Sequence, residues 1–456
     1  MTPLGPTLAR WAAGLKFEDL PDAVVADCKD RLLDTLGVAL AAIDLPIGVA
    51  VRKAARTLGA GDQATALGEG RRFDAGTAAL VNGTLAHAMD FDDTHNASVM
   101  HPSAPTVAAA LAACEAANAD GRTLILAIAI GNELGCRLGL ATPGAFHAVG
   151  LHPTSVLGTP AAAAAAGRVF GLPAAAIANS FGIAASQGSG VLEAYADGTW
   201  SKTLHPGWAA HAGIVAARLA QAGFTGPETA FDGRYGLFRA LLPADTAPDF
   251  SAASEGLGRI WVSPETSYKL YACAHSIHAF VEAATRLRAA HDLTPARIAS
   301  VELAVPRGFV GQIAEPRAAK LAPRTSTHAR ASLFYAVAAT LADGALTAAH
   351  YEGTAYTRPD ILALAAKIAH REIPDSDPIR FSGGVTIRTT EGRTFDAFVD
   401  EADGTGARAL APDRVAAKFR MTAGSVLPPA KVERLIGIVS TLDTLPAARM
   451  LMEATA

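Results

Sequence analysis

The chain has 456 residues, of which 50% are hydrophobic and 18% are charged, and its formal net charge is −4. This composition is typical of a folded globular protein and excludes a disordered one, and the length predicts more than one domain. No run of Lys and Arg offers a basic face, so we expect no nucleic-acid partner. Four scattered cysteines without a CxxC pair, and an N-terminus without a basic start and apolar core, predict a cytoplasmic protein with no secretion or membrane segment.

Up to about residue 265 the pattern predicts helices. Apolar residues recur at three- and four-residue spacing in residues 23–43 and 105–119. The Ala-rich residues 159–186 resemble low-complexity sequence, but we interpret them as tightly packed helix, because Ala has the highest helix propensity and lets neighbouring helices approach closely.

The pattern changes near residue 298. Residues 298–306, IASVELAVP, alternate apolar and polar side chains, and residues 385–399 are typical of two strands joined at Glu391 and Gly392. Helical patterns fill residues 331–344 and 358–369 between them and return after residue 402. The sequence therefore predicts a mainly α protein: a large all-helical domain of residues 1–265 and 403–456, with a smaller α+β domain inserted at 266–402.

The stretch HAMDFDDTHNASVMHPSAP, residues 87–105, concentrates three Asp and three His in a chain that is otherwise half apolar. Such a cluster could hold a divalent metal, but its spacing fits neither HExxH nor an EF-hand loop. The alternative is a loop after a helix, with Asp92 and Asp93 as capping residues. His101 fits that alternative less well, because it stands directly before ProSerAlaPro at the start of the next predicted helix.

Other His and Lys residues lie near predicted helix starts. Pro153 suits a first helical position and places His152 at a helix N-terminus, where an anion is favoured, although a capping role fits as well. Lys202 precedes another Pro-initiated helix, and Lys alone is normally a solvated charge. Lys269 and His278 lie in the apolar stretch KLYACAHSIH, where a buried charge needs a partner, whereas Tyr335 on an apolar helix face is more often a core residue.

Together these residue types suit a small polycarboxylate, because Lys pairs with carboxylates and His or Lys moves a proton at a neighbouring carbon. In this order, HAMDFDDTH with HPSAP, GLHPTSVLGT, SKTLHPGWAA and KLYACAHSIH resemble the MmgE/PrpD family, which includes 2-methylcitrate dehydratase, cis-aconitate decarboxylase and iminodisuccinate epimerase. The resemblance covers nearly the whole chain. It implies an all-helical domain, an inserted α+β lid, a homodimer, and catalysis without a metal or organic cofactor.

The resemblance also implies roles for individual residues. The expected catalytic residues are Asp90, His101, His152, Lys202 and Tyr335, and the expected substrate-binding residues are Thr94, Lys269 and His278. His95 and His275 have weaker claims.

The expected function is a cofactor-independent lyase that dehydrates or decarboxylates a small di- or tricarboxylate. DFDDT is closer to the animal decarboxylases than to the DFNDT of the dehydratases, although one more residue separates Thr94 from His101. The alternatives are an epimerase or racemase of an imino- or aminodicarboxylate, and a non-catalytic protein that binds a metabolite or serves as a scaffold.

Overall fold

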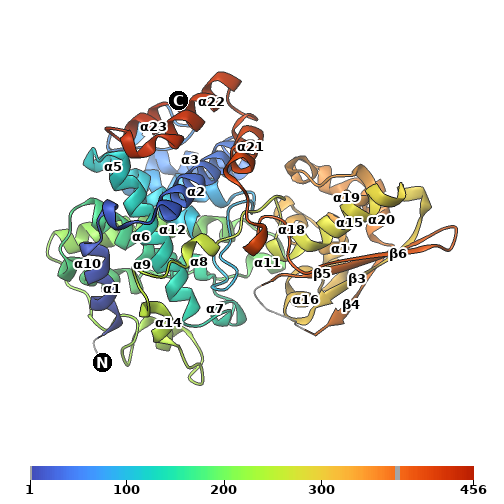
Figure 1. The fold of residues 1–456 in the computed structure, drawn as a ribbon, viewed down its shortest axis with the longest axis horizontal. Helices are drawn as coiled ribbons and strands as arrows, with labels where there is room; N and C mark the ends of the chain where they lie inside the picture. The colour runs from blue at the N-terminus through green and yellow to red at the C-terminus, as the bar shows by residue number, and fades with distance from the viewer. Residues whose placement is uncertain (1–2, 375–379) are drawn as a thin grey trace.

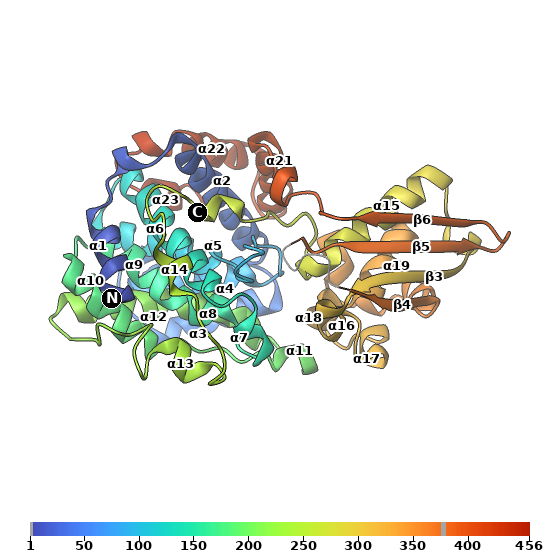
Figure 2. The ribbon, with the colours of Figure 1, turned by 60° about the horizontal axis from the view of Figure 1, so that its bottom comes forward.

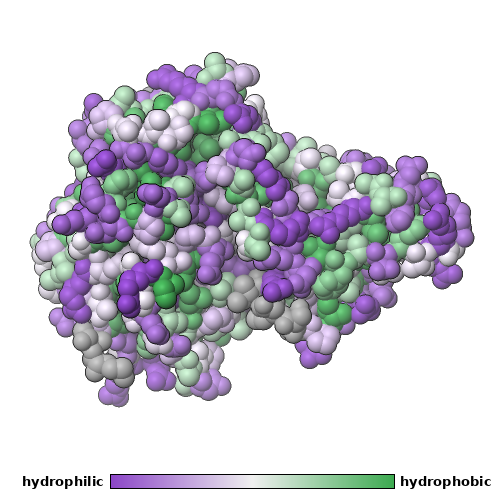
Figure 3. All heavy atoms as spheres, in the orientation of Figure 1, coloured by the Kyte–Doolittle hydropathy of each residue, from purple (hydrophilic) through white to green (hydrophobic). Residues whose placement is uncertain are grey.

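Residues 3–374 and 380–456 are described by the computed structural model, which shows a larger helical body and a smaller body built on a sheet (Figure 1). The prediction of a mainly α protein is confirmed. In the space-filling view the two bodies touch along a narrower neck (Figure 3).

The larger body contains the helices that come before and after the smaller body in the chain. Figures 1 and 2 show the last helices, in red, packed beside the first ones, in blue. Its helices are α1 Leu4–Gly14, α2 Asp22–Ala41, α3 Pro46–Leu58, α4 Ala75–His87, α5 Ser103–Ala117, α6 Gly121–Leu140, α7 Ala145–Ala148, α8 Pro153–Val156, α9 Gly158–Val169, α10 Ala174–Ala185, α11 Ala194–Asp197, α12 Ser201–Gln221, α13 Leu237–Leu241, α14 Phe250–Ser254, α21 Pro412–Ala423, α22 Pro429–Ser440 and α23 Arg449–Glu453. A short hairpin joins α3 to α4, with strands β1 Ala64–Thr65 and β2 Arg72–Phe73.

Small residues let the central helices approach closely. The Ala-rich helix α9 is buried from Gly158 to Gly167 and packs against α5, α6 and α12, which confirms the interpretation of this run as packed helix. Helices α4 and α12 meet at Gly83 and Gly207, where a Cβ built on Gly83 would lie 2.8 Å from the Cα of Gly207. Dispersion contacts between closely packed backbones therefore replace those of large side chains in this core.

Helix α6 is long and apolar enough to cross a membrane, and the bent pair α2 and α3 passes the same test only if it counts as one span. Most of the apolar window of α6, 89%, is buried inside the molecule. Packing in the core of the larger body therefore accounts for the hydrophobicity of this helix.

The C-terminal helix α21 is tied to the loop that follows α4. The Nζ atom of Lys418 lies 2.7 Å from an Asp34 carboxylate oxygen on α2 and donates a hydrogen bond of 2.9 Å to the Phe91 carbonyl. All three groups are buried, so the ammonium charge is compensated inside the core.

The smaller body is a four-stranded sheet with helices packed on it. Strands β3 Ile298–Pro306, β4 Ile368–Ile373, β5 Gly383–Thr389 and β6 Thr394–Val399 are arranged in the order β4-β3-β5-β6. Strand β3 runs parallel to β4 and antiparallel to β5, and β5 pairs antiparallel with β6. The helical segments of this body are α15 His278–His291, α16 Arg307–Ile313, α17 Arg317–Leu321, α18 Ser326–Arg330, α19 Leu333–Asp343, α20 Pro359–Ala365 and the 3₁₀ turns η3 His275–Ile277, η4 Pro295–Arg297, η5 Ala348–Tyr351 and η6 Ala355–Thr357.

Strand β3 and the hairpin of β5 and β6 confirm the predicted strands. The predicted helix at 358–369 ends instead at Ala365, and β4 begins at Ile368. A separate buried hydrophobic cluster runs from Cys273 to Ala402, which supports 266–402 as the extent of the smaller domain, and we keep these boundaries as a proposal.

The contact between α4 and α12 predicts a large effect of one methyl group. Gly207→Ala should lower the free energy of unfolding by about 2 kcal/mol, because the new Cβ would overlap the Leu80 carbonyl and Thr84. Gly437→Ala on α22 is the matched control, since its Cβ would meet nothing within 4 Å. Urea unfolding should show this control to be neutral or more stable by up to about 1 kcal/mol. Equal effects of the two substitutions would contradict this account of the core.

Candidate active site

The loop after α4 brings Asp90 between two lysines that are distant in sequence. Thr94 in this loop pairs with Ser267 as an isolated antiparallel bridge, which places Lys269 beside the loop. The Nζ atom of Lys269 donates to Asp90 Oδ1 at 2.5 Å and to the Asp90 carbonyl at 3.0 Å, and Lys202 Nζ lies 3.7 Å from Oδ1. Burial would raise the pKa of Asp90, but Lys202 and Lys269 hold it well below its usual range. Asp90 is therefore an ionised bridge between two ammonium groups.

A second contact of Lys202 leads to a buried histidine. Lys202 Nζ lies 2.7 Å from Nε2 of His87, the last residue of α4, and Nδ1 of His87 lies 2.8 Å from an Asp92 carboxylate oxygen. Burial lowers the pKa of His87 despite the nearby Asp92. Burial would also lower the pKa of Lys202, but Asp90, together with Tyr195 and Asp92, raises it. The charges favour a neutral His87 that accepts from Lys202 and donates to Asp92.

His101 faces the same region from the start of α5. Its Nδ1 lies 2.7 Å from the Asp93 carbonyl and 3.2 Å from Thr94 Oγ1. A carbonyl only accepts, so Nδ1 carries the hydrogen and Nε2 holds the lone pair. Burial, with the positive charge of Lys269, holds the pKa of His101 well below its usual range against the effect of Asp92.

His152 stands immediately before α8, and Pro153 is the first helical residue as predicted. Its Nδ1 lies 3.0 Å from Nδ1 of His205, and its buried Nε2 has no hydrogen-bond partner among the described residues. The ring centroids of His87, His101 and His152 lie 4.7 to 5.8 Å apart. Burial, together with Lys202, lowers the pKa of His152 well below its usual range, so a cluster of neutral imidazoles surrounds one ammonium group.

Asp90, Thr94, His101 and Lys269 border a cavity of about 560 Å³ between the two bodies, which suits a small organic molecule, and Lys202, His87 and His152 lie behind this wall. The larger body lines it with Asp90, Thr94, Val99, His101, His147 and Tyr195, and the smaller body and its connection contribute Lys269, His275, Ser276, Phe309, Gln312 and Phe381. Asp90, Val99 and Phe381 have φ values of 50° to 53°, which L-residues rarely adopt. Backbone strain of this kind gathers at functional sites, and here three such residues meet at one cavity.

Comparison with known proteins decides the family. The MmgE/PrpD N-terminal domain matches residues 6–249, and the MmgE/PrpD C-terminal domain matches residues 271–444. The chain belongs to the MmgE/PrpD family. Its relatives include cis-aconitate decarboxylase from Aspergillus terreus (strain NIH 2624 / FGSC A1156), 27% identical over 98% of this chain and 94% of the relative. The human cis-aconitate decarboxylase is 29% identical over 95% and 90%, and the cis-aconitate decarboxylase-like protein oryM of Aspergillus oryzae is 27% identical over 96% and 94%.

Of the residues expected from the MmgE/PrpD pattern, six come together at or behind the cavity: Asp90, Thr94, His101, His152, Lys202 and Lys269. His278 is packed behind His275, with Nε2 3.1 Å from the Tyr271 carbonyl. Tyr335 is fully buried on α19, and its hydroxyl donates a hydrogen bond of 2.6 Å to the His350 carbonyl. Neither His278 nor Tyr335 lines the cavity.

Two expectations about local arrangement differ from the structure, and one residue of the site was not expected. Helix α12 begins at Ser201 and contains Pro206, so Lys202 lies in its first turn and not before it. Asp92, interpreted as a capping residue, is the carboxylate that contacts a histidine, whereas Asp90 contacts the two lysines. His87 was missed, because the periodicity of α4 accounts for it as an ordinary helix residue.

His275 is better placed than its weak sequence claim suggested. It lines the cavity, is 4% exposed, and neither of its ring nitrogens has a hydrogen-bond partner among the described residues. Burial, with the charge of Lys269, lowers its pKa to about 3. This imidazole is therefore a polar group in the cavity wall that could accept a hydrogen bond from a ligand or donate one to it.

Two overlapping groups have enough donor atoms close together to hold a metal ion: His87, His101 and His152, and His87, Asp90, Asp92 and His101. Both nitrogens of His87 already have partners in Asp92 and Lys202. Two ammonium groups next to Asp90 would also repel a divalent cation. The donor set therefore fits an anion better than a metal.

The buried histidines predict lower stability in mild acid. The pKa values of His147 and His275 are lowered to about 4 and about 3 from the ordinary 6.5, so the unfolded chain binds more protons between those limits. The free energy of unfolding should therefore fall as the pH falls from 6.5 towards 4. Asp30 and Asp93, whose pKa values are raised to about 6 by burial, act in the opposite direction, but the lowered pKa values of His95 and His205, about 4 and about 3, add to those of His147 and His275 and outnumber them. Urea unfolding at several pH values should show this decrease, and His147→Gln should make it shallower. Constant or rising stability would contradict the neutral state of the cluster.

Proposed function

We propose that this protein is a lyase that releases carbon dioxide from a small unsaturated tricarboxylate of the cis-aconitate type. The observation that carries the proposal is the meeting of Lys202 and Lys269 at Asp90, beside neutral imidazoles and at the wall of a cavity between the two bodies. The relatives that match over almost the whole chain support this choice of substrate and favour loss of carbon dioxide over loss of water or epimerisation.

The cavity is suited to a ligand with several negative charges. Asp90 holds Lys202 and Lys269 close together before a ligand arrives, because a buried cation needs a counter-charge. A polycarboxylate would contact the exposed edge of this cluster, together with Thr94 and the unpaired nitrogens of His275. The electrostatic attraction is strengthened where water is excluded.

Decarboxylation breaks the bond between a carboxylate carbon and its neighbour, and the electron pair of that bond remains on the organic product. Because the broken bond is allylic to a double bond, its electron pair shifts along the carbon skeleton of the substrate towards another carboxylate. A proton then adds to carbon and completes the product. Lys202 and Lys269 would stabilise the negative charge that develops. His101 is our candidate carrier of this proton, with His152 behind it, because its ring lines the cavity and its Nε2 lone pair can take up a proton and then deliver it to carbon.

In this proposal, binding of the substrate is coupled to protonation of His101. The free site keeps this imidazole neutral through burial and the lysine charges. An incoming trianion places negative charge near the ring and favours its cationic form. Binding of the substrate would therefore favour the protonated form of His101, which is the form that donates a proton.

The smaller body would serve as a lid. His275, Gln312, Phe309 and Phe381 close one side of the cavity, whereas His101 and Asp90 form the other side. Movement of this body would admit the substrate and then exclude water. His278 would support His275 from behind and Tyr335 would stabilise the core of the lid, so we no longer place either among the groups that touch substrate.

Proton NMR in D2O tests the reaction directly. With cis-aconitate we expect a single decarboxylated alkene that carries one deuterium on carbon, together with carbon dioxide or bicarbonate. Lys202→Met should lower kcat/KM by about a thousandfold, which corresponds to about 4 kcal/mol of lost transition-state stabilisation. Lys53→Met, an exposed lysine on α3, is the control and should behave as wild type. Unchanged turnover in Lys202→Met would exclude this lysine from the anion site. If deuterium instead entered a dicarboxylate that was otherwise unchanged, the proposed activity would be epimerisation and not lysis.

Calorimetry tests the coupling of protonation to binding. Propane-1,2,3-tricarboxylate has no double bond, so it should bind without turnover. Titrations near neutral pH in buffers with different ionisation enthalpies should show uptake of about one proton per site. His101→Asn should reduce this uptake. Equal heats in all buffers would show that the imidazoles stay neutral and that another group supplies the proton.

A further inference from the structure

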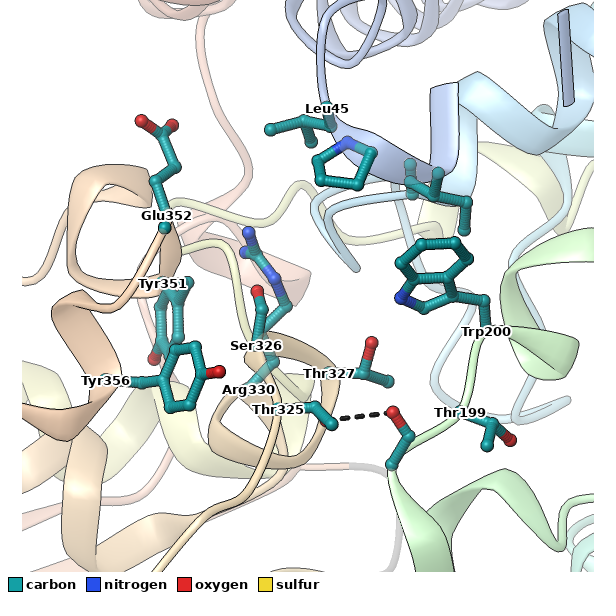
Figure 4. Close-up of a pocket in the computed structure, with 15 residues that line it drawn as sticks. Leu45, Thr199, Trp200, Thr325, Ser326, Thr327, Arg330, Tyr351, Glu352 and Tyr356 are labelled. Carbon is teal, nitrogen blue, oxygen red and sulfur yellow. Dashed lines mark hydrogen bonds between the residues drawn. The ribbon is translucent and has the colours of Figure 1, made fainter. Parts of the chain in front are cut away.

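A second cavity, of about 530 Å³, lies at the junction of the two bodies and shares no lining residue with the catalytic cavity (Figure 4). The larger body contributes the start of α3 at Leu45–Ile47 and the residues Gly198–Trp200 before α12. The smaller body contributes α18 and the segment around Tyr351 and Tyr356. Thr325 Oγ1 donates a hydrogen bond of 2.8 Å to the Gly198 carbonyl and so joins the two bodies at the cavity floor.

Arg330 is a buried cation in the wall of this cavity, only 5% exposed. Its Nη1 atom donates to the Met89 carbonyl at 2.9 Å and to the Ala272 carbonyl at 2.6 Å, and the guanidinium lies over the Tyr351 ring at 4.6 Å. The Nε and Nη2 atoms carry three more N–H donors. Among the described residues no carboxylate lies within 4.0 Å of this guanidinium, and Nε and Nη2 make no hydrogen bond.

Asp90 and Glu352, which also lines the cavity, act on Arg330 only from a distance, and within the described part of the chain no carboxylate contacts its guanidinium. A buried cation without a direct partner is costly, so the unused N–H donors of Arg330 point to a ligand. The rest of the cavity fits an anion with an apolar body. The first turn of α3, a helix of 13 residues, adds backbone amides without intrahelical partners and the positive end of the helix dipole. Ser326 and Thr327 supply hydroxyls, and the rings of Trp200, Tyr351 and Tyr356 form flat apolar walls (Figure 4).

We propose that this cavity is a second ligand site, for a small organic anion with one carboxylate or phosphate group on a planar apolar body. The anionic group binds Nε and Nη2 of Arg330, and the body lies between Trp200 and the two tyrosines. The ligand contacts both bodies at once. It also lies close to the catalytic loop, because the Met89 carbonyl that Arg330 holds belongs to the residue before Asp90.

The test introduces a carboxylate on α18 that competes with the anion for Arg330. Ser326 and Arg330 are four residues apart on α18, so the carboxylate of Ser326→Glu reaches the guanidinium. Ser326→Gln is the matched neutral control, and Thr327→Glu repeats the charge from the neighbouring position. The probes are benzoate, phenyl phosphate and the neutral benzamide, and ligand-observed NMR gives the dissociation constants. Circular dichroism identifies the variants that fold.

We expect benzoate or phenyl phosphate to bind the wild type, with at most a small loss in Ser326→Gln, whose amide replaces the hydroxyl as a donor. The anion that binds more tightly identifies the head group. Ser326→Glu or Thr327→Glu should weaken binding about tenfold, benzamide should not bind, and Lys202→Met should bind as wild type. Binding that is lost in Lys202→Met but kept in Ser326→Glu would place the probe in the catalytic cavity and overturn the proposal. The proposal would also be overturned if neither anion bound. It would be overturned as well if binding appeared only after dilution had dissociated a dimer of the chain. The readout needs no turnover, so it is independent of the proposed lyase activity.

Discussion

The site depends on one electrostatic constraint: Asp90 is shared by two lysines that come from distant parts of the chain. Lys202 is in the first turn of α12, and Lys269 is in the connection to the smaller body, so neither lysine approaches the other without the carboxylate between them. Without Asp90 two ammonium groups would repel each other in a buried position. The left-handed backbone at Asp90 aims both its side chain and its carbonyl at Lys269, and the fold around the loop bears this strain.

The neutral imidazoles follow from the same constraint. Deep burial disfavours a cationic ring at His101 and His152. Lys269 and Lys202 add to this at His101, where Asp92 only partly offsets it, and Lys202 adds to it at His152. The free site therefore stores positive charge on lysine and keeps its histidines uncharged. An anionic ligand reverses that balance, which gives the cavity a chemical response to the charge of its occupant and not only to its shape.

Much of the arrangement could be predicted from sequence, and the exceptions have physical reasons. Apolar residues at helical spacing sufficed to predict α2 and α5, and alternation with a turn signal sufficed for the hairpin of β5 and β6. The sequence did not show that α5 is buried on every side from Ser103 to Glu115. The helix expected at 358–369 extends into the first two residues of β4, and the sequence does not predict the rest of this strand, because a mostly exposed edge strand lacks the alternation of a half-buried one. The motifs identified six site residues, but Tyr335 belongs to the core face of α19. His87 becomes visible only when the chain reverses after α4 and brings Asp92 back to it, and a one-dimensional pattern does not contain that reversal.

The bond from Lys418 to the Phe91 carbonyl spans 327 residues of sequence. During synthesis the loop that carries Asp90 emerges long before its support on α21, and the whole smaller body is made in between. The Phe91 carbonyl and the Asp34 carboxylate therefore lack their partner, the buried ammonium of Lys418, until nearly the entire chain has left the ribosome. The active-site loop is one of the first parts of this protein to be translated and one of the last to reach its final form, so chains cut short before α21 should be inactive even where the helices around the site have already formed.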